Sequence, residues 1–340
     1  MAATSQDKGL QGIRGWSSLS VVLYHVSLPT IVGSLLIGWG WAAVVLFFVV
    51  SGHILGKKWL AGDYHRPAPG GRRFDAARYF ARRFWRIWPV YLLTLPMFVL
   101  LGLFPFEWQL FGMAQYLVPL YSPTGFPLMP QWTLAIEEIF YATLPLWVIA
   151  VGGKRWILLL GALAAVSVAS SFFVPLWFEL PQYAVAYVFG LMSARGIRLR
   201  LPLSVTVPLV VGAMVAVNLW RYTDPLTVLI ASLASWVIVT EWRRTALFTN
   251  RWSSRLGNLT YPLYLVGIPA LAITHDLLGT QWAWGLLSVP AAVSIAWALH
   301  RGVEGPLIRM GRRLEGRTPR LLAPEARSNS VQEIVDKLSR

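Results

Sequence analysis

An arginine and a histidine share one face of the first apolar segment, where they could bind and activate a substrate. Arg14 opens this segment and His25 follows eleven residues later, about three helical turns, or roughly 16 Å along the helix axis. A neutral His25 could act as a general base toward a hydroxyl, or take an acyl group before passing it on. The alternative is structural: a hydrogen-bonded packing histidine and an arginine that extends its charge to a polar boundary.

Two adjacent carboxylates lie in another apolar segment, which reads WTLAIEEIFYATLP. Neighbouring helical residues point about 100° apart, so Glu137 and Glu138 cannot both face one cavity squarely. An ionised carboxylate in apolar surroundings is costly without a partner. We therefore expect at least one of them to face the protein interior, either in a functional role or in a structural ion pair with an arginine.

A third cluster is basic. In the run YFARRFWRIWPVY, Arg82, Arg83 and Arg86 lead into an apolar helix. Pro89 stands early in that segment, as a first-turn proline can. Arginines at a helix start could bind a phosphate or pyrophosphate group. They could equally be a basic anchor that sets the orientation in a membrane.

The segments that carry these residues belong to an unusually apolar chain. Of its 340 residues, 56% are hydrophobic and 13% are charged, and the mean hydropathy is +0.55, unlike an ordinary soluble domain. Its 18 Trp and 12 Tyr suit membrane interfaces. The absence of cysteine excludes disulfides, thiolate metal sites and cysteine nucleophiles. The sequence therefore predicts an all-α, polytopic integral membrane protein.

Ten segments approach the ~20 residues that one membrane crossing requires. They are 15–34, 36–56, 86–104, 131–150, 155–174, 181–194, 202–220, 225–240, 257–275 and 281–299. The polar N-terminal stretch has no signal-peptide pattern, so we expect the first segment to be retained.

The basic residues indicate the orientation. Ten crossings put both termini on one side, and every Lys and Arg except Arg221 falls on that side. By the positive-inside rule, this side is the cytoplasm. Membrane orientation then explains the net charge of +15 without nucleic-acid binding. The basic face could also attract anionic lipid or a phosphorylated substrate. We expect a transmembrane domain over residues 1–310, a polar cytoplasmic tail over 311–340, and a multi-pass location in the cell membrane.

Four motifs, in this order along the chain, resemble the acyltransferase family 3 membrane proteins. They are LQGIRGWSSLSVVLYHV with the family's gap between Arg14 and His25, FFVVSG at Phe47 to Gly52, RRFWRIWPVY, and WTLAIEEIFY. Weaker similarities follow in LGNLTYPLYL at 256–265 and VEGPL at 303–307. Three positions depart from the family pattern: Val45 replaces a frequent Asp, Gly267 a frequent His, and Gly305 interrupts a common Glu-Arg-Pro.

The resemblance implies an acyltransferase that transfers groups other than amino-acyl groups. It would move an acyl group, which we expect to be acetyl, from cytoplasmic acyl-coenzyme A to a hydroxyl of a sugar, as in polysaccharide O-acetylation. It implies His25 and Glu137 as catalytic residues, since Glu137 matches the family's glutamate by its spacing from Trp132 and Phe140. The residues it implies for substrate binding are Arg14, Arg83, Arg86, Ser51, Trp132 and Tyr141.

The same resemblance implies no bound cofactor and no metal, with acyl-coenzyme A as co-substrate. Expected partners are membrane lipids and a glycan, glycolipid or glycosylated natural-product acceptor. The external loop 105–130, rich in aromatics and prolines, is the candidate for acceptor recognition. A transporter or flippase is the alternative, because ionisable residues at mid-membrane also build proton relays and gates. We find no inverted repeat or paired broken helices in the sequence, as transporters often have.

Overall fold

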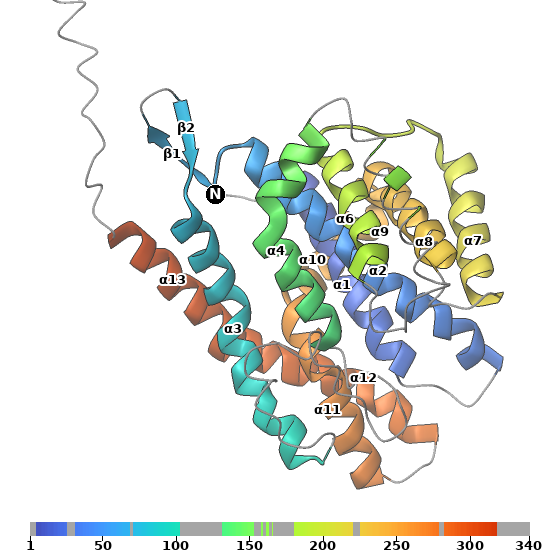
Figure 1. Cartoon of the computed structure of the whole chain (residues 1–340). Helices are drawn as coiled ribbons and strands as arrows, with labels where there is room; N and C mark the ends of the chain where they lie inside the picture. The colour runs from blue at the N-terminus through green and yellow to red at the C-terminus, as the bar shows by residue number, and fades with distance from the viewer. Residues whose placement is uncertain are drawn as a thin grey trace, which may run out of the picture.

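The computed structural model is a bundle of helices with one short hairpin at its edge (Figure 1). It describes residues 5–25, 31–68, 71–102, 131–152, 158, 161–162, 165, 180–219, 225–278 and 282–317. In these residues the predicted all-α fold is confirmed, apart from a two-stranded antiparallel sheet in which His65 pairs with Phe74.

The described elements follow one another in this order along the chain. The first are α1 (Ser5–His25), α2 (Ile31–Leu60), β1 (His65–Ala68), β2 (Gly71–Phe74), α3 (Ala76–Leu100) and α4 (Gln131–Gly152). Then come α6 (Leu180–Ala194), α7 (Leu203–Leu219), α8 (Pro225–Val237), the π-helix η3 (Ile238–Trp242), α9 (Ala246–Thr249) and α10 (Arg251–Asn258). The last are α11 (Thr260–Leu278), α12 (Trp282–Leu299), the π-helix η4 (His300–Glu304) and α13 (Gly305–Arg317).

The predicted apolar segments agree with these helices. Each of them overlaps a described helix except 155–174, which lies largely outside the described residues. The beginning of the predicted polar tail, at residue 311, falls within α13. The remainder of that tail, 318–340, and the loop 105–130 lie outside the part of the chain that the structure describes.

The start of α3 differs from the prediction. The helix begins at Ala76, well before the apolar segment, because the Asp75 side chain accepts a hydrogen bond from the Arg78 amide at 3.1 Å and caps it. Pro89 therefore lies inside the helix, and the prediction of a first-turn proline is wrong. The suggestion that a helix start contributes to an anion cradle is wrong for the same reason, since Arg83 lies well inside the helix, where the backbone amides are already bonded. Anion binding by the arginine side chains stays a prediction.

One described helix is long and apolar enough to span a membrane, by length and composition alone. It is the part of α2 from Gly40 to Leu60, with a mean hydropathy of 1.6. The pair Arg251–Asn258 and Thr260–Leu277 would be a second if its two helices, bent by 72°, formed one span. The ten-span topology and the orientation of the termini stay predictions.

Helix α2 packs against α1, α6, α7 and α8. Its contact with α6 depends on two glycines, because a Cβ atom at Gly190 would lie 2.8 Å from the Cα atom of Gly52. Helix α4 packs on α6 through the stacked rings of Phe140 and Tyr187, whose centroids are 3.5 Å apart. Helix α1 also contacts α11. As a result, residues of α1, α2, α4 and α11 line one pocket.

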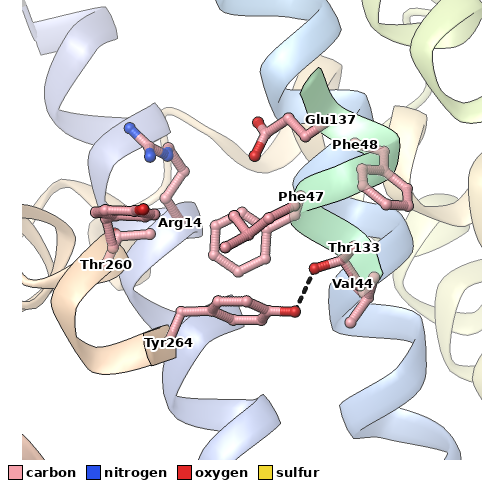
Figure 2. Close-up of a pocket in the computed structure, with 10 residues that line it drawn as sticks. Arg14, Val44, Phe47, Phe48, Thr133, Glu137, Thr260 and Tyr264 are labelled. Atoms are coloured by element: carbon pink, nitrogen blue, oxygen red, sulfur yellow. Dashed lines mark hydrogen bonds between the residues drawn. The ribbon is translucent and has the colours of Figure 1, made fainter. Parts of the chain in front are cut away.

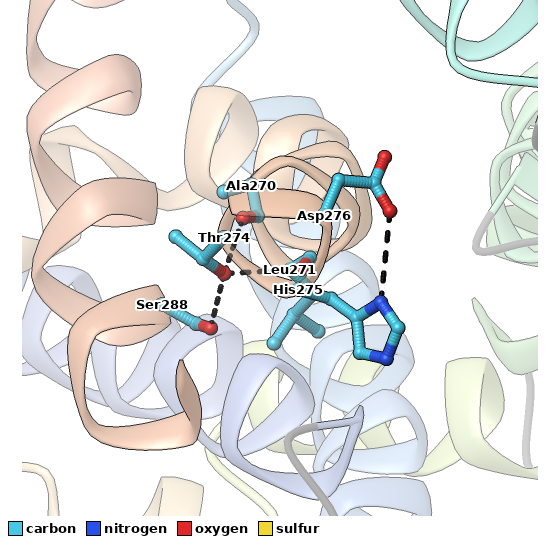
Figure 3. A network of polar contacts seen from close by, with 6 residues as sticks. All are labelled: Ala270, Leu271, Thr274, His275, Asp276 and Ser288. Atoms are coloured by element: carbon cyan, nitrogen blue, oxygen red, sulfur yellow. Dashed lines mark hydrogen bonds and ion pairs between the residues drawn. The ribbon is translucent and has the colours of Figure 1, made fainter. Parts of the chain in front are cut away.

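Helices α11 and α12 are joined by a buried contact between hydroxyl groups (Figure 3). The Oγ1 atom of Thr274 lies 2.6 Å from Oγ of Ser288 and 2.8 Å from the carbonyl oxygen of Ala270. On the same helix, His275 and Asp276 form an exposed pair 3.6 Å apart. The hydroxyl contact therefore satisfies its polar groups within the helix pair, as buried polar groups require.

Candidate active site

A pocket opens between α1, α2, α4 and α11 (Figure 2). Its volume is about 40 Å³, room for about three water molecules. Arg14 of α1 and Glu137 of α4 face it from opposite sides, so that a cation and a carboxylate border one space. The other lining residues are Val44, Phe47, Phe48, Thr133, Leu134, Thr260, Tyr261 and Tyr264.

The Glu137 carboxylate is held by two hydroxyl groups. Ser51 of α2 donates to its Oε1 atom at 2.6 Å, and the Tyr141 hydroxyl, one turn further along α4, donates to the same oxygen. Hydrogen bonds to an ionised acceptor are stronger than those between neutral groups. Glu137 also interacts electrostatically with Arg14. Ser51 and Tyr141, predicted to bind substrate, therefore position this carboxylate.

Arg83 lies on the other side of Tyr141. Its guanidinium carbon is 5.2 Å from the centre of the Tyr141 ring, within the range of a cation–π contact. The side chain is only 6% exposed, and Nη2 donates to the Tyr64 hydroxyl at 3.2 Å. Burial raises the pKa of Tyr79, whose hydroxyl donates to the Tyr141 carbonyl at 2.9 Å. Arg83 is thus linked to Glu137 through Tyr141, and Arg86 interacts electrostatically with Arg14.

His25 is the last residue of α1, and only one of its two ring nitrogens forms a hydrogen bond with a described residue. Nδ1 lies 2.7 Å from the Val21 carbonyl oxygen, and because a carbonyl can only accept, Nδ1 carries the proton. Nε2 is then the unprotonated nitrogen, and no hydrogen bond joins it to any residue that the structure describes. The ring packs edge-on against Tyr24. The half-buried imidazole is therefore oriented with a lone pair available for a proton or an acyl carbon.

The structure brings together most of the predicted site residues. Arg14 and Glu137 share the pocket, and contacts or charge interactions connect them to Ser51, Tyr141, Arg83 and Arg86. His25 does not line this pocket, and among described residues its partner is Val21 rather than Glu137. The Trp132 side chain lies outside the described residues.

The two adjacent glutamates have different surroundings. Glu138 does not line the pocket; it interacts through a hydrogen bond with Trp88, and its Oε1 atom is buried without a partner in the described part of the chain. Glu137 has three neighbours that could stabilise a negative charge, namely Ser51, Tyr141 and Arg14. The two side chains therefore do not share one cavity, as helical geometry requires.

Sequence reasoning missed a second histidine. His53 of α2 is 1% exposed, with Arg243 donating to Nε2 at 3.2 Å. An arginine cannot accept, so Nδ1 carries the proton and donates to Ser193 Oγ of α6 at 2.7 Å. Burial, together with the nearby Arg244 and Arg198, lowers the pKa of Arg243. The position of His53 just after the FFVVSG motif was the available signal.

Two further contacts, one of them in the pocket, also escaped prediction. The hydroxyls of Thr133 and Tyr264 are hydrogen-bonded across the pocket floor (Figure 2), and Tyr264 comes from the weaker YPLYL similarity. At Gly267, a Cβ atom would lie 2.8 Å from Cγ2 of Val22. With glycine at this position, α11 packs directly on α1.

Comparisons with known proteins bear on this arrangement. A family model described as "Acyltransferase domain" matches residues 7–301. The chain is 26% identical to "Acyltransferase MdmB" of Streptomyces mycarofaciens, over 96% of this chain and 97% of that protein. It is 26% identical to "Putative acetyltransferase ORF330" of Acidianus two-tailed virus, over 55% of this chain.

A third relative is "Putative peptidoglycan O-acetyltransferase YrhL" of Bacillus subtilis (strain 168), 30% identical over 42% of this chain. The match spans 57% of the viral protein's length and 23% of the Bacillus protein's. No solved structure matches the chain.

Proposed function

Because the chain belongs to acyltransferase family 3 and is a transferase of acyl groups, we propose that it moves an acetyl group from acetyl-coenzyme A to a hydroxyl of a glycan or glycosylated acceptor. The observation that carries the proposal is the open Nε2 atom of His25 on the same helix as Arg14 of the pocket. We further propose that the protein works as a multi-pass protein of the cell membrane.

The proposed donor site uses arginines. Arg14, Arg83 and Arg86 lie close enough to interact with one another or with the same carboxylate. Arginine forks match phosphate oxygens in geometry and charge, so these side chains would bind the pyrophosphate of coenzyme A. The acyl arm would then extend along α1 toward His25.

The proposed chemistry takes place at Nε2 of His25. As general base, this nitrogen takes the proton of the acceptor hydroxyl while the hydroxyl oxygen attacks the thioester carbonyl. The carbon–sulfur bond breaks, and the coenzyme A thiolate receives the proton from the imidazolium. In the covalent route, Nε2 itself forms a bond to the acyl carbon while the carbon–sulfur bond breaks and releases the coenzyme A thiolate. In a second step the acceptor hydroxyl attacks that carbon, the carbon–nitrogen bond breaks, and the hydroxyl proton passes to Nε2 and then to the thiolate. The Nδ1–H bond to Val21 serves both routes, since it fixes the tautomer in which the neutral ring has its lone pair on Nε2.

The acceptor class rests on the relatives. The Bacillus relative is named as a peptidoglycan O-acetyltransferase, and the Streptomyces relative, which matches nearly end to end, is named as an acyltransferase. A hydroxyl of a glycan or of a glycosylated natural product fits both names.

The test is release of free coenzyme A from acetyl-coenzyme A by purified protein in detergent, with mixed cell-envelope glycans as acceptor. We expect release and acetylated glycan from the wild type and from His275→Ala, which alters an exposed histidine, but not from His25→Ala. Uptake or binding of a substrate without coenzyme A release would favour a transporter and overturn the proposal. Isolation of an acetylated His25 peptide would select the covalent route.

A further inference from the structure

The end of α2 places a lysine at a fixed position beside α3. The amide of Asp63 donates to the Lys58 carbonyl at 3.0 Å and the amide of Gly62 to the Trp59 carbonyl at 3.0 Å. With Gly62 at a φ of 80°, these bonds form the glycine-terminated cap of a helix. The cap fixes the backbone of Lys58 in the last turn of α2.

Aromatic rings join this helix end to α3. The Trp59 ring contacts His65 and Phe74 of the hairpin, at centroid distances of 4.8 and 5.0 Å. Tyr64, which follows the cap, packs edge-on against Tyr79 of α3 at 4.9 Å. The Tyr64 hydroxyl accepts the hydrogen bond from Arg83. The end of α2, the hairpin and the start of α3 therefore form one packed unit that holds Lys58 near Arg83.

Basic groups outnumber acidic ones in this unit. Lys58 is partly buried and interacts electrostatically with Arg83, Arg86 and Arg82 and with one acid, Asp63. Glu137 and Glu138 also interact electrostatically with Arg83. No carboxylate in the described part of the chain forms an ion pair with Lys58, Arg83 or Arg86. Arg83 also has a buried Nε–H without a hydrogen-bond partner among the described residues. Like charges held together with little solvent repel, and an anion bound among them relieves that repulsion.

We propose that Lys58 is a third basic ligand, beside Arg83 and Arg86, for the phosphoryl groups of the coenzyme A donor. This inference rests on the proposed function and adds to it a residue from another helix. Lys58 supplies a compact ammonium charge, whereas the arginines supply planar forks. A phosphorylated donor bound there would contact the ends of both α2 and α3, so the aromatic unit would determine the spacing of its cations.

The experiment measures KM for acetyl-coenzyme A in neutral detergent without anionic lipid, with Lys58→Met as the main variant. Methionine keeps the apolar stem and removes the charge. We expect KM to rise about tenfold to a hundredfold, the loss expected for one hydrogen bond to a charged group, with kcat changed less than twofold. Lys58→Arg keeps a positive charge, so its KM for acetyl-coenzyme A should stay within about threefold of the wild-type value.

The matched control is Lys57→Met, one residue earlier on α2, where the side chain is exposed. It should leave KM unchanged. Acetyl-dephospho-coenzyme A, which lacks the 3′-phosphate, identifies the phosphoryl group concerned. If Lys58→Met no longer has an effect with this donor, Lys58 binds the 3′-phosphate; if the effect persists, Lys58 binds the pyrophosphate.

Binding of coenzyme A, measured by calorimetry, distinguishes a failure of the inference about Lys58 from a failure of the proposed function. If the wild type binds coenzyme A and Lys58→Met binds it equally well, the inference about Lys58 is wrong and the proposed function stands. If the wild type neither binds nor consumes the donor, both are overturned. If Lys58→Met lowers the thermal midpoint and leaves KM unchanged, Lys58 only stabilises the end of α2, as a lysine near a helix C-terminus can, and the inference is wrong.

Discussion

Two histidines on neighbouring helices, His25 on α1 and His53 on α2, show how the surroundings decide what an imidazole can do. Both have a protonated Nδ1 that donates a hydrogen bond, to Val21 in one case and to Ser193 in the other. They differ at Nε2, which accepts from Arg243 in His53 and has no partner among the described residues in His25.

The difference separates a chemical role from a structural one. A nitrogen that already accepts a hydrogen bond from an arginine cannot take a proton without losing that bond, and His53 is nearly inaccessible. It connects α2, α6 and the segment after η3. His25 is half-buried and keeps one lone pair available. Burial alone would have pointed to the wrong histidine.

The largest expected effect is that His25→Ala lowers activity without lowering stability, whereas His53→Ala does the opposite. His25→Ala should lower kcat by about 10² to 10⁴-fold, the range for loss of a general base, while the thermal midpoint stays near that of the wild type. His53→Ala should keep the turnover per folded molecule and lower the free energy of unfolding by about 2 to 4 kcal/mol, because it removes a buried side chain and two hydrogen bonds. Activity assays and thermal unfolding of both variants check this; the reverse pattern would reject the comparison.

A second, smaller effect concerns the adjacent carboxylates. Glu137→Gln removes the negative charge facing Arg14 but leaves an oxygen that can accept from Ser51 and Tyr141. We expect kcat/KM to fall about tenfold to a hundredfold, since charged hydrogen bonds are replaced by neutral ones. Glu138→Gln is the matched control and should change kcat/KM less than threefold. Equal losses of kcat/KM in both variants would contradict the inference that Glu137, which lines the pocket, contributes to activity and Glu138 does not.

A third test removes one of the two hydroxyls that hold the Glu137 carboxylate. Tyr141→Phe keeps the ring against Arg83 and deletes the donor to Glu137. Because Ser51 still donates to the same oxygen, the expected loss in kcat/KM is about threefold to tenfold. The double variant with Ser51→Ala should lose more than the product of the single effects, as residues that share one partner do. Strictly multiplicative losses would show that they act independently.

The smallest expected effect concerns the buried hydroxyl contact between α11 and α12. Ser288→Ala removes one of the two hydroxyls in Figure 3, while Thr274 can still donate to the Ala270 carbonyl. We expect the free energy of unfolding to fall by about 0.5 to 1.5 kcal/mol, with no change in coenzyme A release. A loss of turnover in this variant would mean that polar contacts far from the pocket also contribute to activity.

The sequence predicted which segments are helical because apolarity over a long window is a local property. It misplaced the start of α3, since the polar turns that precede the apolar stretch are held by the Asp75 cap. The cost of charge in apolar surroundings identified Arg14 and the pair Glu137 and Glu138 as candidates, and the resemblance to the family singled out Glu137. The sequence could not pair Glu137 with Ser51, 86 residues away, because that contact depends on how α2 and α4 pack. The tautomer of His25 likewise required the position of the Val21 carbonyl.

The close packing at Gly267 constrains how this chain could change over time. A side chain at this position would collide first with Val22, which is itself buried. A residue larger than glycine at position 267 would therefore require Val22 to move or to be replaced by a smaller residue. We expect the residues at positions 22 and 267 to vary together.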